Sequence, residues 1–291
     1  MIEIKLSQGA KPGHGGILPG AKNTPEIAAI RLVEAGKDVI SPSTHPEFST
    51  PVGLLEFIQQ LRELSEGKPV GFKLCIGRRS EFIGICMAMH NTGITPDFIT
   101  VDGGEGGTGA APLEYSNSVG MPLREALAFV DDCLRGFDLR DKIRIIAAGK
   151  IISSFQIAKN LALGADMCNS ARGMMLALGC VQSLCCHTNR CPTGVATQDP
   201  RLVRGLVVED KAERVQRFHR ETVRALTDLM SSAGIRHTRD FQRSDIFCRI
   251  NPHQIMRYDQ IFPPVETGAF IAAPYPDNYA ELINISSSDH F

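Results

Sequence analysis

The sequence lacks several features that would place it in a special class. Its net charge is −1, from 31 basic and 32 acidic residues, and it has no long run of one sign. Neither a nucleic-acid surface nor a polybasic membrane patch is therefore expected. No apolar stretch approaches the ~20 residues that a membrane-spanning helix needs, and no signal-peptide pattern is present. Nine cysteines, four of them clustered at 180–191, are too few and too unevenly spread for a secreted disulfide scaffold. We expect a reducing, cytoplasmic compartment.

Short apolar runs alternate with amphipathic segments along most of the chain. Thr24-Pro25 and Thr50-Pro51 have the pattern of a helix N-cap followed by proline at the first helical position. Buried strands that alternate with helices favour an α/β fold with parallel strands. The expected strands are 2–6, 38–42, 70–74, 98–104, 143–149 and 166–171, and further helices are expected at 80–91, 123–133, 154–163 and 209–233.

Charged residues follow the carboxyl ends of these expected strands. They are Lys11, Lys73, Asp102, Lys150 and Arg172. Sites on the loops that follow strands are typical of a (β/α)8 TIM barrel, which we favour over an open doubly wound sheet. The chain shows about six strands where a closed barrel has eight. We therefore predict an incomplete barrel, with two strands expected ahead of Met1, or a fold that is open on one side.

The chain is expected to divide into two parts. Residues 1–235 carry the strand and helix pattern and are predicted to form the partial barrel domain. Residues 236–291 contain prolines and glycines but no helical or strand period, so an irregular C-terminal extension is predicted there.

Two predicted loops have the composition of a phosphate site. Gly149-Lys150 follows one strand, and Arg172-Gly173 opens a helix after the next. Barrels hold phosphate at such positions, where free backbone N–H groups and an arginine can bind a dianion. The alternative is that both glycines only make turns and Arg172 is solvated.

A second glycine-rich loop, DGGEGGTGA at 102–110, lacks the register of a dinucleotide fingerprint. Backbone so free of side chains suits a flat ring such as an isoalloxazine, and the alternative is a mobile loop. Lys73 lies in the apolar run VGFKL and can donate to an anionic or electron-rich ligand at the barrel mouth. Lys11 and Arg31 could clamp a small dicarboxylate, unless both lie on the surface.

Three cysteines in the 180–191 segment have the most specific spacing. Cys180, Cys186 and Cys191 could bind a three-iron cluster, or a zinc ion together with His187. Plain buried thiols are the alternative.

With these motifs, the sequence resembles the FMN-binding synthase domain of glutamate synthases, and in particular the free-standing bacterial proteins of that type. The resemblance covers residues 2 to about 235. The stretches that carry it are QGAKPGHGG (8–16), ISPSTH (40–45), FKL (72–74), the loop 102–111, LGAD (163–166), ALGC (177–180) and CHTNRCPTGVATQD (186–199).

The resemblance implies a barrel that carries FMN beside a [3Fe-4S] cluster. Reduced flavin would pass hydride to the imine formed from 2-oxoglutarate and ammonia, giving L-glutamate. By motif, Gln8, Lys11 and Arg31 would hold the 2-oxoglutarate, with Lys73 beside the flavin. The implied flavin-binding residues are Lys73, Asp102, Gly104, Glu105, Gly106, Gly107, Thr108, Gly149, Lys150, Arg172 and Gly173, and the implied cluster ligands are Cys180, Cys186 and Cys191.

The sequence departs from the family pattern at several points. His14 stands where the large synthases have glutamate in the motif KPGEGG, and Gly149-Lys150 replaces a glycine pair. The family's first two strands and its glutaminase domain are not recognised, so ammonia would come from solution or a partner, as would electrons. Two alternatives remain: an FMN oxidoreductase acting on another 2-oxo acid or amine, and a cofactor-poor barrel piece without independent catalysis.

Overall fold

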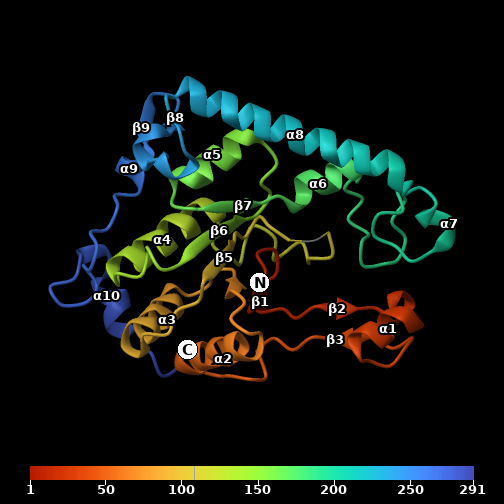
Figure 1. Ribbon diagram of the computed structural model, residues 1–291, viewed down its shortest axis with the longest axis horizontal. Helices are drawn as coiled ribbons and strands as arrows, with labels where there is room; N and C mark the ends of the chain where they lie inside the picture. Colours follow the sequence, from red (N-terminus) through yellow and green to blue (C-terminus); the bar gives the residue numbers. More distant parts are fainter. Residues whose placement is uncertain (108) are drawn as a thin grey trace.

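The computed structural model describes residues 1–107 and 109–291, and a parallel β-sheet lies at its centre (Figure 1). The strand order is β1-β4-β5-β6-β7, and every neighbouring pair is parallel. The strands are β1 (Ile2–Lys5), β4 (Val70–Leu74), β5 (Phe98–Asp102), β6 (Arg144–Ala148) and β7 (Met167–Asn169).

The helices follow the strands in the predicted alternation. Thr24 and Thr50 cap α1 and α2 as expected, because their hydroxyls accept the N–H groups of Ile27 and Gly53. No helix in the described ranges is long and apolar enough to cross a membrane. The helices are α1 (Pro25–Arg31), α2 (Pro51–Leu64), α3 (Arg79–Thr92), α4 (Leu123–Gly136), α5 (Ser154–Ala162), α6 (Ala171–Leu178), α7 (Pro200–Val203) and α8 (Val208–Ser232).

The hydrophobic core lies between the sheet and helices α2, α3 and α4. Ile58, Phe72, Phe82 and Leu127 are fully buried there. The sheet also carries polar groups, since the hydroxyl of Thr100 on β5 donates to the carboxylate of Glu3 on β1 at 2.7 Å. One side of the sheet is thus a packed core, and polar side chains of β1 and β5, which lie on either side of β4, interact with one another.

The sheet confirms the predicted α/β class with parallel strands, but it has five strands instead of six among the described residues. The predicted strand 38–42 is wrong as a member of this sheet. Only Val39–Ile40 is extended (β3), and it pairs antiparallel with β2 (Ile17–Leu18). The run is short and ends at Pro42, while β1 pairs directly with β4 and leaves no place between them. Figure 1 shows β2, β3 and α1 as an arm that extends away from the sheet.

The strand order decides between the two architectures considered. Strands β1, β4, β5, β6 and β7 lie side by side in chain order, as the staves of a barrel do. A doubly wound sheet instead reverses its order at a switch point. The sheet is therefore an arc of (β/α)8 type that is open between β7 and β1.

The segment after residue 235 is more regular than the sequence indicated. It contains a hairpin and two helices, and Tyr258, Phe270, Tyr279 and Ile283 from it are buried in the main core. Its aromatic residues are widely spaced, so they produce no helical or strand period. The elements are β8 (Phe247–Asn251), β9 (Gln254–Arg257), α9 (Tyr258–Ile261) and α10 (Asp277–Ile285).

Candidate functional site

Most of the predicted flavin residues line one cavity at the carboxyl ends of β4, β5, β6 and β7. This cavity, cavity A, has a volume of about 460 Å³, within the range of small-molecule sites. The predicted residues that line it are Gln8, Lys73, Asp102, Gly106, Gly107, Gly149, Lys150, Arg172, Cys180 and Cys186. The parallel strands explain the grouping, because their carboxyl ends meet at one edge of the sheet.

The two glycine-rich loops lie backbone against backbone beside cavity A. A Cβ atom at Gly9 would lie 1.8 Å from the carbonyl oxygen of Gly103, and one at Gly107 would lie 2.3 Å from the Cβ of Ala10. The φ of Gly107 is +113°, which side chains rarely tolerate. These positions need glycine because the two chain segments approach too closely for a further Cβ atom. Thr108, also predicted for this loop, lies outside the described residues.

Asp102 fixes the contact between these loops. Its side chain is buried at the end of β5, and its Oδ2 accepts the N–H of Gly9 at 2.8 Å. Burial raises the pKa of this carboxyl, although the Gly9 N–H and the nearby Lys73 act in the opposite direction. Asp102 therefore holds the loop after β1 over the end of β5.

Three of the predicted flavin residues do not line cavity A. Glu105 accepts the N–H of Leu123 at 2.9 Å, so it anchors the start of α4. A Cβ at Gly104 would lie 2.4 Å from the carbonyl oxygen of Gly120. One at Gly173 would meet Ser170 and Phe218, because α8 packs closely on the first turn of α6. These residues shape the loops around the cavity and lie behind its surface.

The predicted phosphate end of cavity A has an uncapped helix start. Ser170 precedes α6, but its hydroxyl donates to the carbonyl of Ile151 at 2.7 Å and does not cap the helix. Arg172, half-buried in the first turn, donates to the carbonyl of Gly107 at 3.2 Å. Lys150 has a φ of +48°, a conformation that the family's glycine adopts without strain. The helix start and the arginine both face a space that an anion can fill.

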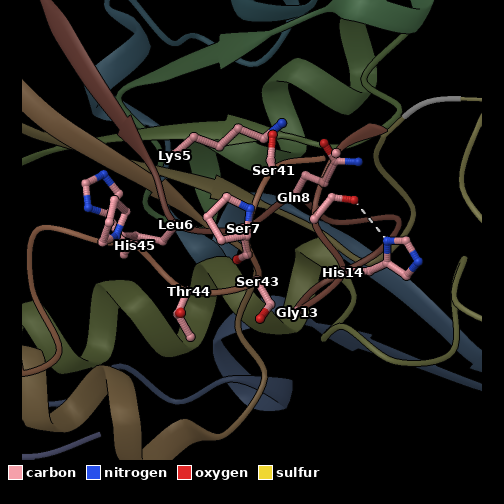
Figure 2. Close-up of a pocket in the computed structure, with 14 residues that line it drawn as sticks. Lys5, Leu6, Ser7, Gln8, Gly13, His14, Ser41, Ser43, Thr44 and His45 are labelled. Carbon is pink, nitrogen blue, oxygen red and sulfur yellow. Dashed lines mark hydrogen bonds between the residues drawn. The ribbon is translucent and has the colours of Figure 1, made fainter. Parts of the chain in front are cut away.

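A second cavity, cavity B, adjoins cavity A at Gln8, which lines both. Its volume is about 290 Å³. Figure 2 shows Lys5, Ser7 and Gln8 entering it from the end of β1, and Ser41, Ser43, Thr44 and His45 from the segment after β3. The Nε2 atom of Gln8 is buried without a hydrogen-bond partner in the described part of the chain. A buried amide donor without a partner favours a bound acceptor here.

Lys5 was not predicted as a site residue. Partial burial lowers the pKa of its ammonium group, and the neighbouring cations Lys73 and Lys11 lower it further. Asp102 and Glu3 act in the opposite direction, so cavity B lies beside three lysines that two carboxylates partly balance. The available sequence signal was the lysine at the end of the strand IEIKL, which precedes Gln8 by three residues.

The predicted dicarboxylate clamp is not assembled in this structure. Lys11 is buried, and its Nζ donates to the carbonyl of Gly15 at 3.2 Å. Arg31 is exposed at the end of α1, in the arm that Figure 1 shows away from the sheet, and it lines neither cavity. The structure does not place these two residues on one cavity, because the β2–β3 pair carries α1 outward.

The three predicted cluster ligands are also not gathered. Within 1–107 and 109–291, no three His, Cys, Asp or Glu side chains are arranged to hold a metal ion. Cys180 and Cys186 line cavity A, whereas Cys191 is buried in a turn. Burial would raise the pKa of Cys191, but hydrogen bonds from Thr193 and from backbone N–H groups of residues 193, 195 and 196 lower it overall. The donor set does not fit a three-iron cluster in this arrangement.

Comparison with known proteins identifies the family. The family model described as "Conserved region in glutamate synthase" matches residues 1–236. The glutamate synthase large subunit-like protein YerD of Bacillus subtilis is 44% identical over 260 residues, which are 89% of this chain and 49% of YerD. The chain belongs to the glutamate synthase family.

This glutamate synthase family member spans about half the length of the curated relatives it matches. The archaeal glutamate synthase [NADPH] of Methanocaldococcus jannaschii is 40% identical over 235 residues, covering 80% of the chain and 45% of that protein. Among solved structures, the flavin-binding domain of baker's yeast flavocytochrome b2 covers 75% of the chain and 41% of its own, with 14% identity and a TM-score of 0.40. A similarity this low adds nothing to the fold described above.

Proposed function

We propose that this chain is the FMN-binding part of an oxidoreductase of glutamate synthase type. The observation that carries the proposal is cavity A, which joins an uncapped helix start, a glycine bed and Lys73 in one space. FMN, when bound, supplies hydride transfer, while the protein supplies binding, orientation and electrostatics. Residues 1–235 would carry this chemistry, and residues 236–291 would support it by packing on the core.

Each part of cavity A suits one part of FMN. The backbone N–H groups at the start of α6 and the guanidinium of Arg172 would bind the phosphate. Gly106 and Gly107 line the cavity with main chain, which a flat ring could approach closely. Lys73 reaches the same space from the end of β4 and would donate to an electron-rich atom of the ring.

Cavity B would bind the 2-oxo acid. Lys5 would pair with its carboxylate, and the free Nε2 of Gln8 and the hydroxyls of Ser41 and Ser43 would supply hydrogen bonds. Gln8 borders both cavities, so a substrate there would adjoin the cofactor. Ammonia would condense with the 2-oxo group and release water, and the resulting imine would receive hydride and a proton. With 2-oxoglutarate the product is L-glutamate.

A different 2-oxo acid is the second candidate substrate. His14, which replaces the family's glutamate, lines cavity B, and Arg31 lies outside it. One expected carboxylate partner is therefore missing, which favours a substrate with a single carboxylate. Ammonia and electrons would come from solution or from partners such as a glutaminase and an electron donor.

The iron–sulfur cluster stays a prediction from the sequence. Cys180, Cys186 and Cys191 match the family's ligands by motif, but the structure does not bring them together. No step of the proposed reaction is assigned to a cluster.

Replacing Arg172 with alanine is expected to weaken FMN binding about tenfold, because one charge-assisted hydrogen bond to the phosphate is lost. The measurement is a titration of the purified chain with FMN, followed by flavin fluorescence. Arg201→Ala is the control, since Arg201 pairs with Asp199 on the surface and lines neither cavity. A wild-type chain that binds no FMN would contradict the proposal and favour a cofactor-poor barrel piece.

Replacing Lys5 with methionine is expected to weaken 2-oxo acid binding about tenfold and to leave FMN affinity unchanged. Binding is measured from the change in bound-flavin absorbance on titration with 2-oxoglutarate, then with pyruvate. Lys37→Met, which removes an exposed lysine paired with Glu34, is the control. If Lys5→Met and Lys37→Met lose 2-oxo acid affinity equally, the substrate binds outside cavity B.

A further inference from the structure

A third cavity, cavity C, adjoins cavity B and is larger. Its volume is about 690 Å³, against about 290 Å³ for cavity B. A Cβ at Gly13, which lines both cavities, would meet no atom within 4 Å, so the border between them is open there. The residues that line both cavities are drawn in Figure 2 and are Leu6, Ser7, Gly13, Ser43, Thr44 and His45. A ligand whose head group lies in cavity B can therefore extend into cavity C.

The inner wall of cavity C is apolar. At the border with cavity B, the ring of His45 stacks on Phe48 with the ring centroids 4.5 Å apart. A wall of this kind favours an apolar group, because the bound group and the wall both leave water. The rest of the inner wall comes from the end of β4 and the first turns of α3, and its buried apolar residues are Leu74, Ile76, Phe82 and Ile85.

Cavity C offers little to a second carboxylate of the substrate. Among its described lining residues, Arg78 and Glu81 carry opposite charges. Arg78 directly precedes α3 and Glu81 lies in the first turn of that helix, so the carboxylate of Glu81 offsets the guanidinium of Arg78. Arg78 is also exposed, and an exposed ion pair contributes little. A carboxylate placed against the buried apolar wall would lose its hydration without gaining a partner.

We propose that cavity C receives the side chain of the substrate, and that the substrate is a 2-oxo acid with a bulky apolar side chain, branched or aromatic. The inference rests on the proposed function, because the carboxylate and the 2-oxo group lie in cavity B, beside Lys5 and Gln8, as described there. The side chain passes the open border at Gly13. Condensation with ammonia still releases water, and the imine still gains hydride and a proton, so the product is the matching apolar amino acid.

Three 2-oxo acids test this assignment in a calorimetric titration of the 291-residue chain saturated with FMN. The compounds 4-methyl-2-oxopentanoate and 2-oxoglutarate are similar in size, but the first ends in two methyl groups and the second in a carboxylate. Pyruvate carries a single methyl group. We expect 4-methyl-2-oxopentanoate to bind about thirtyfold more tightly than pyruvate, because its further carbons leave water in cavity C. It is also expected to bind more tightly than 2-oxoglutarate.

The outcomes separate this inference from the proposed function. Equal affinities for 4-methyl-2-oxopentanoate and pyruvate, or tightest binding of 2-oxoglutarate, overturn the inference and leave the proposed function standing. A chain that binds none of the three acids overturns both the inference and the assignment of cavity B to a 2-oxo acid.

Replacing Val119 with aspartate makes the test specific to cavity C. Val119 lines cavity C and neither of the other two cavities, and it is 53% exposed, so an aspartate there stays hydrated in the unliganded chain. The measured quantity is the affinity for 4-methyl-2-oxopentanoate divided by that for pyruvate, which is expected to fall about tenfold. Leu113→Asp, at an exposed position outside all three cavities, is the control and should keep the ratio of the wild type.

Replacing Gly77 with leucine repeats the test by filling cavity C. Gly77 lines this cavity, and a Cβ there would meet no atom within 4 Å, so the larger side chain needs no movement of the backbone. The ratio of the two affinities is again expected to fall, because the leucine takes up part of the space for the substrate's side chain. This variant serves if Val119→Asp does not fold. An unchanged ratio in either folded variant overturns the proposal.

Discussion

Replacing Gly9 with alanine is expected to reduce FMN affinity more than any other single methyl group added to this chain. The new Cβ would lie 1.8 Å from the carbonyl oxygen of Gly103. The Cβ is fixed by the backbone of residue 9 and the oxygen belongs to the backbone of Gly103, so no side-chain rotation can relieve the clash. The loop after β1 must therefore lift off the end of β5 and break the hydrogen bond between Gly9 and Asp102. Overpacking of this kind costs about 3 kcal/mol or more when backbone must move, roughly a hundredfold in affinity.

Gly16→Ala is the matched control for this change, because it lies in the same loop and its Cβ would approach Ser41 no closer than 3.6 Å. Fluorescence titration with FMN measures both variants, and far-UV circular dichroism checks that both are folded. Gly16→Ala is expected to bind FMN like the wild type. Normal FMN binding by Gly9→Ala would show that the two loops need not touch for cavity A to form.

The parts of the fold that local chemistry determines could be predicted from the sequence. Thr24 and Thr50 start helices because each hydroxyl accepts a backbone N–H three residues further on and each threonine is followed directly by proline. All of these contacts lie within four residues of the chain. The strand 38–42 could not be placed, since Val39 and Ile40 look like any buried β-branched pair. Their position depends on β1 having already paired with β4, a contact between residues about 68 apart. Sequence periodicity contains no information about such partners.

The same distinction applies to the candidate site. Lys73, Asp102 and Arg172 line the same cavity because each lies at or after the end of a strand, and parallel strands bring their carboxyl ends together. Of the residues that line cavity B, Gln8 was predicted from its motif, whereas Ser41 and Ser43 were not, because they follow a strand that is not in the sheet. Arg31 lies outside both cavities for a related reason, since the direction of the arm determines where α1 lies.

Replacing Arg243 with methionine is expected to produce the largest loss of stability of any substitution considered, about 3–5 kcal/mol. Its guanidinium is buried and donates to Asp131 and Asp132 on α4 at 3.0 and 2.8 Å, and to the carbonyl of Phe262 at 2.8 Å. Methionine fills a similar volume but leaves Asp132 buried with only the hydroxyl of Tyr279 as a side-chain partner. Equilibrium unfolding in urea measures the loss.

The pH dependence separates a lost ion pair from lost packing. Burial already raises the pKa of Asp132 in the wild type, and Arg243 is the main opposing influence, so the pKa rises further in Arg243→Met. A carboxyl whose pKa is higher in the folded state destabilises the fold increasingly as pH rises above the usual aspartate range. The loss of stability in Arg243→Met, relative to the wild type, should therefore become smaller on acidification. Arg144→Met, which removes a largely exposed partner of Asp166 at 3.4 Å, is expected to cost about 0–1 kcal/mol. A deficit in Arg243→Met that stays constant with pH would mean that the arginine holds the C-terminal segment through packing and backbone contacts, with the buried charges contributing little.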